Sequence, residues 1–73
     1  MDITTHCARI TEPVAYRAGN GRMQHIPIGP CLVEILDKPW IDIIWGANGQ
    51  SSAALPLQAV ETAQTHGHLV LLD

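Results

Sequence analysis

The chain has 73 residues, of which 47% are hydrophobic and 15% are charged, and its formal net charge is −3. This balance excludes intrinsic disorder, which needs few apolar residues and a high net charge. A chain of this length forms one small domain, residues 1–73, and buries only about 60% of the surface that its unfolded form exposes. Because charged residues are few, we expect some aliphatic side chains to stay exposed unless a partner covers them.

Turn signals occur at short, even intervals and divide the chain into strand-like runs. Gly19-Asn20-Gly21 predicts the turn of a first hairpin, and Pro13 confines the arm before it to a sheet edge or a bulge. Asn48-Gly49 predicts a second hairpin with a type I′ turn, because this dipeptide readily takes positive φ angles. Asp37-Lys38-Pro39 predicts a further tight turn. The predicted strands are residues 7–17, 22–28, 31–36, 40–45, 52–57 and 68–72.

A segment near the carboxyl end has helical character. Pro56 stands near its first position, good helix formers follow, and Gly67 comes shortly after its end. The spacing places Leu57, Val60 and Gln64 on one face. Because the segment is too short to be stable as an independent helix, we expect a 3₁₀ turn or one to two α-turns over residues 56–64, docked against the sheet.

The order of the elements over residues 31–72 is a strand ending in Trp45, a hairpin turn, a strand of small residues, a helical turn and a last apolar strand. This order resembles the second half of an SH3-like small barrel, similar to Tudor and KOW-type modules. The resemblance implies an all-β fold, a small antiparallel barrel of five to six short strands. The alternative is an open antiparallel sheet covered on one face by a longer helix at 56–66.

Strand alternation predicts which side chains are buried and which form an interface. Ile41, Ile43 and Trp45 share one face and are assigned to the core, whereas Trp40 is expected to be partly exposed as a contact residue. Residues 31–36 and 68–72 are apolar on both faces, and a small barrel has only one interior. The predicted interface consists of Leu32, Leu36, Trp40, Val70 and Leu72. We therefore expect a non-enzymatic interaction module that self-associates as a homo-oligomer or binds a protein partner.

Nucleic-acid binding is an alternative function. Arg17 and Arg22 flank the first hairpin turn, and Arg9 can lie on the same hairpin. Three arginines can contact a few phosphates, but the net charge of −3 opposes the approach of a polyanion. The same arginines also suit a solvated hairpin tip.

Metal binding or enzymatic activity is a further alternative, based on His66 and His68. Residues i and i+2 of an extended strand point to the same side, so two imidazoles could converge on one metal. His6, Cys7, His25 and Cys31 are further donors, but no ligand spacing joins them. Solvated loop histidines are the simpler interpretation.

Features of other function classes are missing from the sequence. Cys7 and His6 are neighbours on a strand and point to opposite faces, so they form no nucleophile and base. Glu34 and Asp42 can lie opposite each other on neighbouring strands, where we expect solvent-facing side chains. We predict no catalytic residue and no cofactor. Neither a signal peptide nor a membrane-spanning run is visible, so we expect a cytoplasmic protein with reduced thiols and no membrane contact.

Overall fold

Seven strands and one helix account for most of the described chain. The computed structural model describes residues 4–35 and 40–72. The elements are β1 (Thr4–Ile10), β2 (Val14–Arg17), β3 (Met23–Ile26), β4 (Gly29–Ile35), β5 (Trp40–Trp45), β6 (Ser51–Pro56), α1 (Leu57–Thr65) and β7 (Leu69–Leu71). Leu36 and the predicted turn at Asp37-Lys38-Pro39 lie outside the described residues. The mostly-β class is confirmed.

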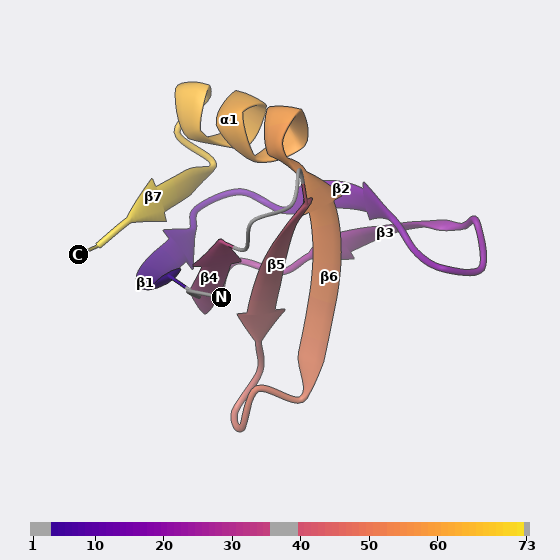
Figure 1. Cartoon of the computed structure of the whole chain (residues 1–73), viewed down its shortest axis with the longest axis horizontal. Helices are drawn as coiled ribbons and strands as arrows, with labels where there is room; N and C mark the ends of the chain where they lie inside the picture. Colours follow the sequence, from indigo (N-terminus) through magenta and orange to yellow (C-terminus); the bar gives the residue numbers. More distant parts are fainter. Residues whose placement is uncertain (1–3, 36–39, 73) are drawn as a thin grey trace.

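The strands form two antiparallel sheets. The larger sheet has the order β6-β5-β4-β1-β7, and the smaller one is the β2–β3 hairpin, which projects from the body of the molecule (Figure 1). Within the described residues, β6 and β7 are the two edges of the larger sheet and do not pair with each other. The described strands therefore make an open sheet, with α1 connecting its two edges, rather than a closed barrel.

The expected first hairpin arm, residues 7–17, is two strands instead of one. β1 ends at Ile10 and pairs with β4 and β7, whereas β2 begins at Val14 and pairs with β3. Pro13 explains the break, because it has no N–H to donate to a ladder. The exit from β1 is held by Thr11, whose N–H donates to the carbonyl of His68 at 2.8 Å.

Both hairpin turns are built around glycine at the last turn position. Gly21 (φ 85°) donates to the carbonyl of Ala18 at 2.9 Å, and Gly49 (φ 67°) donates to that of Gly46 at 3.3 Å. All described residues with positive φ are glycines, so Asn48 does not adopt the type I′ geometry that we expected. A longer loop with the left-handed residue at its end is the common alternative to the two-residue turn.

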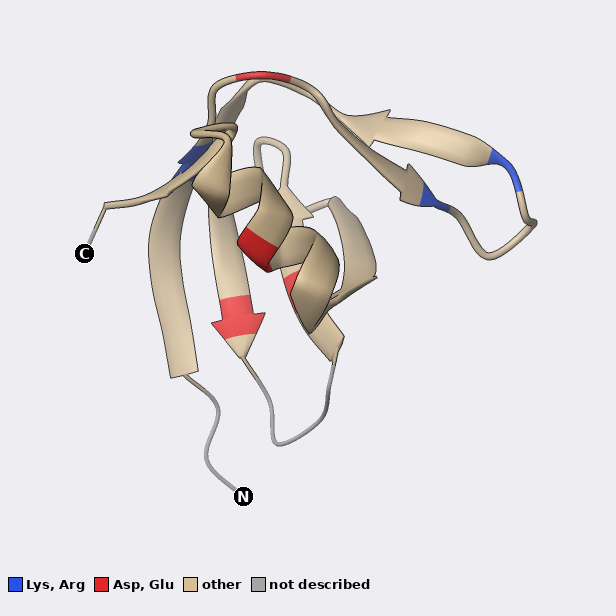
Figure 2. Cartoon of the chain, turned by 90° about the horizontal axis from the view of Figure 1, so that it is seen from above, with Lys and Arg blue, Asp and Glu red and all other residues tan. Residues whose placement is uncertain are grey.

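One face of the larger sheet, called the inner face, carries the core. Ile10, Ile43 and Leu55 are almost fully buried there, and α1 lies across this face and adds Val60 and Ala63 (Figure 2). The core consists of Ala8, Ile10, Val14, Ile26, Cys31, Val33, Ile41, Ile43, Ala53, Leu55, Val60, Ala63 and Leu69. The assignment of Ile41 and Ile43 to the core is confirmed, whereas Trp45 is half-buried and packs against the core from outside.

The helix is a nine-residue α-helix, longer than the one to two turns expected. Its first residue is Leu57, which the sequence placed both in the strand over 52–57 and in the helical segment over 56–64; it belongs to the helix and is 48% exposed. The carboxyl end is a Schellman motif: His68 donates to the carbonyl of Ala63 at 2.9 Å and Gly67 to that of Gln64 at 3.0 Å. Among the helices of residues 4–35 and 40–72, none is long and apolar enough to cross a membrane.

Candidate functional site

The face of the larger sheet opposite the core, called the outer face, carries a continuous apolar row. Cys7 pairs with Leu32, and Leu32 pairs with Ile44, so these three side chains lie side by side on β1, β4 and β5. Leu72 lies next to them, because its N–H donates to the carbonyl of Cys7 at 2.8 Å. These four residues, Leu72, Cys7, Leu32 and Ile44, are called the outer row. The row runs from β5 across β4 and β1 to the residue that follows β7, and none of its four side chains is charged.

The outer row is accessible to solvent. Leu32 is 40% exposed and Leu72 is 60% exposed, whereas Ile44 is half-buried. A hollow of about 350 Å³ opens over the row and is bounded by the β5–β6 loop. This loop explains the lower exposure of Ile44: a Cβ on Gly49 would lie 3.3 Å from Ile44 Cγ2, so the loop folds onto that side chain. The row is therefore an open apolar surface that is bounded at the Ile44 end by the β5–β6 loop.

Charges of opposite sign flank the outer row along the strands. On one side of the row, Arg9 lies two residues after Cys7 on β1. Its register partners on the neighbouring strands are Val70 and Pro30. On the other side Glu34 of β4 pairs directly with Asp42 of β5. Alternation places all of these side chains on the outer face together with the row. The face is thus basic on one side, apolar in the middle and acidic on the other side.

The structure brings together three of the five predicted interface residues. Leu32, Val70 and Leu72 lie on the same part of the outer face, and all are at least 40% exposed. Trp40 is 49% exposed, as expected, but it pairs with Pro56 and lines a separate pocket of about 470 Å³ beside the β2–β3 hairpin. Leu36 lies outside the described residues.

Two residues of the row, Cys7 and Ile44, were missed by the sequence reasoning. The sequence does show that each of them lies on the opposite face of its strand from a core residue, since Ile44 follows Ile43 and Cys7 precedes Ala8. The register between strands was not visible, because Cys7 was assigned to a hairpin arm that pairs with residues 22–28. Only the pairing of β1 with β4 places Cys7 beside Leu32.

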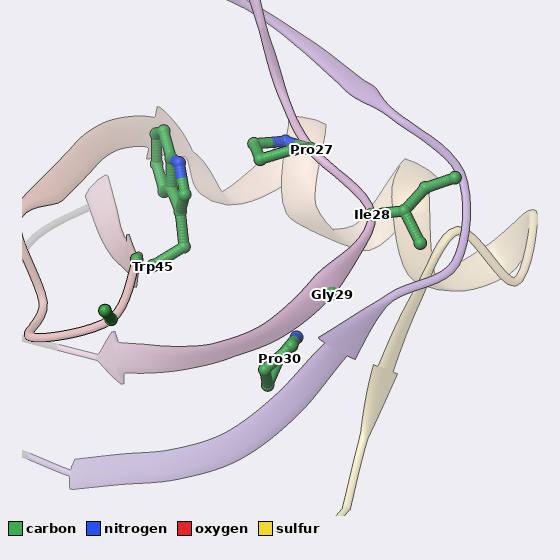
Figure 3. Close-up of a pocket in the computed structure, with 7 residues that line it drawn as sticks. Pro27, Ile28, Gly29, Pro30 and Trp45 are labelled. Atoms are coloured by element: carbon green, nitrogen blue, oxygen red, sulfur yellow. The ribbon is translucent and has the colours of Figure 1, made fainter.

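A proline-lined pocket adjoins the outer row on the side of Arg9, whose register partner Pro30 lines it. It has a volume of about 430 Å³, and its walls include Pro27, Pro30 and Trp45, as Figure 3 shows. Ile28, although part of the same segment, points away from Trp45 in this view. The indole of Trp45 is held by an edge-to-face contact with Tyr16, with ring centroids 6.0 Å apart. Pro30 and Trp45 also border the hollow over the row, so the two depressions are neighbours.

His66 and His68 are close together but not on a strand. His66 caps the carboxyl end of α1 and His68 precedes β7, and their ring centroids are 5.6 Å apart. The pair lines a shallow pocket with uncharged neighbours from α1 and the β1–β2 segment. Within residues 4–35 and 40–72, no three His, Cys, Asp or Glu side chains gather in a group that could hold a metal ion. Two imidazoles alone supply half of a tetrahedral ligand set.

The three arginines are divided between the two sheets. Arg17 and Arg22 lie at the end of the β2–β3 hairpin, whereas Arg9 is on β1 in the larger sheet (Figure 2). The Arg17 guanidinium donates to the carbonyl of Gly21 at 3.4 Å, and the Arg22 N–H donates to Asn20 Oδ1 at 3.0 Å. The expected placement of Arg9 on this hairpin is therefore wrong, because β1 pairs with β4 and β7.

The two cysteines have different environments. Cys7 is exposed in the outer row, whereas Cys31 is buried on the inner face, and neither takes part in a disulfide. Burial raises the pKa of the Cys31 thiol above its ordinary value, because the thiolate would lose its hydration. Cys31 is thus a neutral core residue, and Cys7 is the thiol that a partner or a reagent can reach.

Comparison with known protein families, with curated proteins and with solved structures finds no match. The chemistry of the outer face therefore carries the functional argument.

Proposed function

We propose that this chain is a non-enzymatic protein-interaction module that has the element order of an SH3-like small barrel, although its larger sheet is open over the described residues, and that binds a protein through its outer face. The order of the elements supports this likeness. The β5–β6 hairpin is followed by α1 and then by β7, which returns to pair with β1. This is the succession of hairpin, helical turn and closing strand on which the resemblance rests.

The observation that carries the proposed function is the outer row itself. Leu32 and Leu72 expose 40% and 60% of their surface on a face that also holds Val70, although the inner face already supplies a complete core. Burying apolar surface contributes about 25 cal/mol per Å². A row of neighbouring exposed aliphatic side chains therefore favours contact with another protein over contact with water.

Substitution at the centre of the row tests this function. We compare the wild type with Leu32→Glu by sedimentation velocity and by the fluorescence of an apolar dye. The matched control is Leu57→Glu, because Leu57 is similarly exposed but lies on α1, away from the row. We expect the wild type either to self-associate or to bind the dye, and Leu32→Glu alone to lose that property. A wild type that stays monomeric and binds no dye would refute the proposal.

A further inference from the structure

We infer that the partner of the outer face is a second copy of this chain, packed face to face about a two-fold axis that runs along the outer row. This inference rests on the proposed function of that face. It identifies the partner from the distribution of charge around the row and predicts which residues meet across the interface.

The geometry of the sheet allows two orientations of a face-to-face dimer. Two identical sheets can superimpose one outer row on another by a two-fold axis in the interface plane, either along the strands or along the row. With an axis along the strands, each residue faces a residue at the same height along the strands of the other copy. With this axis between β1 and β4, at the middle of the row, Glu34 faces Thr5 of the second copy and lies diagonal to the second Glu34. The acidic side of one copy then covers the acidic side of the other as the sheets close to their usual spacing of about 10 Å.

The charges that flank the row distinguish the two orientations. An axis along the row reverses the strand direction, so the basic side of one copy covers the acidic side of the other. Arg9 then faces Thr5 of the second copy, and Glu34 is the register partner of Thr5 on the neighbouring strand. Sheets packed face to face lie about 10 Å apart, and the long side chains of Arg9 and Glu34 together span such a diagonal. The dimer therefore contains two Arg9–Glu34 pairs, one for each Arg9, and complementary charge selects this axis over the other.

The acidic pair supports a cationic neighbour. Glu34 and Asp42 are directly opposed on adjacent strands and both are half-buried. Like charges directly opposite each other destabilise a sheet. A guanidinium brought next to Glu34 offsets that repulsion. The isolated chain therefore places two like charges side by side on the same face that carries its exposed apolar row, and a second copy in this orientation covers the row and brings a cation to the pair.

The size of the face also suits a dimer. A standard interface takes about 800 Å² from each partner, which is about one sixth of the 4875 Å² surface of the chain. Five strands at about 4.8 Å spacing make a face roughly 24 Å across. The outer row and its two flanking rows, about 6.7 Å apart along the strands, make a flat area of about 24 Å by about 20 Å, roughly 500 Å² before the relief of the side chains is counted.

The first test exchanges charge across the predicted contact. By sedimentation equilibrium, we expect Arg9→Glu to weaken dimerisation at least about tenfold, and Arg9→Glu combined with Glu34→Arg to restore it. The matched control is Arg22→Glu, which changes the net charge equally but lies at the hairpin turn and should leave the dimer intact. Far-UV circular dichroism checks that each variant is folded. Equal weakening by Arg9→Glu and Arg22→Glu, or no recovery in the double variant, would overturn the orientation.

The second test uses the thiol of the row. With the axis along the row, Cys7 lies opposite Cys7 of the second copy. We expect a short bismaleimide to link two chains in the Cys31→Ala variant and to yield no linked dimer in Cys7→Ser. Absence of the linked product in a protein that sediments as a dimer would overturn the orientation. A protein that stays monomeric while its row binds apolar dye would refute the second copy as partner and leave the proposed function standing.

Discussion

Glu34 and Asp42 are direct register partners on β4 and β5, so two carboxylates occupy adjacent positions on the outer face. The expectation that they lie opposite each other is confirmed, but both are half-buried rather than fully exposed to solvent. Like charges directly opposite each other on adjacent strands destabilise a sheet, and the unfolded chain does not hold these two residues opposite each other.

Removing one charge of this pair should stabilise the fold. We expect Asp42→Asn to raise the free energy of unfolding by about 0.2–1 kcal/mol, because opposed like charges cost about that much in a sheet. Urea unfolding at low micromolar protein concentration measures the effect. Glu61→Gln is the control, since it removes the same charge from an exposed position on α1. An equal gain in both variants would show that net charge, not the pairing, is responsible.

Gly67 should be required by its backbone conformation alone. It has φ 74° at the end of α1, and no atom lies within 4 Å of where a Cβ would be. We expect Gly67→Ala to lower the free energy of unfolding by about 1–2 kcal/mol, the cost of a left-handed conformation for an L-residue. Gly19→Ala is the control, because Gly19 has equal space and no positive φ. The prediction is wrong if thermal unfolding shifts by the same amount in both variants.

Two leucines separated by one residue should differ sharply in importance. Leu55 is 2% exposed on the inner face, whereas Leu57 is 48% exposed at the start of α1. Truncation of a buried leucine costs about 2–5 kcal/mol, which is enough to unfold a marginally stable small domain. We expect Leu55→Ala to lose its cooperative thermal transition and Leu57→Ala to change stability by less than about 0.5 kcal/mol. Similar losses in both would contradict the burial difference.

The stability of the fold should decline in alkaline solution through Cys31. Burial raises the pKa of its thiol, so the folded state favours the neutral form. This contribution is complete below the pKa of an unfolded cysteine, about 8.5, and is lost as the pH rises through the higher folded pKa, because the unfolded chain ionises first. We expect the free energy of unfolding of the wild type to fall more steeply above pH 8.5 than that of Cys31→Ala. Parallel pH profiles would contradict it.

Alternation within single strands could be predicted from the sequence, whereas pairing between strands could not. The inward placement of Ile41 and Ile43, and the exposure of Leu32, Val70 and Leu72, follow from the two-residue period of a strand. Pro13 marks the break in residues 7–17 locally, but the pairing of β1 with β4 and β7, and not with β3, is a long-range property. Cys7 therefore joined the candidate surface only through its register with Leu32.

The type of the second hairpin turn also could not be predicted from the sequence. Asn48-Gly49 marked the β5–β6 connection correctly, but the chain uses Gly49 as the left-handed residue at the end of a longer loop. Both turn types use the same dipeptide, and the register Trp45 with Ser51 selects between them. Likewise, the helix after Pro56 is longer than expected, because Val60 and Ala63 gain burial against the inner face that the isolated segment lacks.

The self-association surface is tested most directly by the solvent exposure of leucine methyl groups, measured by NMR with a dissolved paramagnetic probe over a range of protein concentrations. We expect the methyl signals of Leu32 and Leu72 to become protected from the probe as concentration rises, while the exposure of the Leu57 methyls on α1 stays unchanged. Equal and unchanged exposure of all three leucines at every concentration would contradict this prediction.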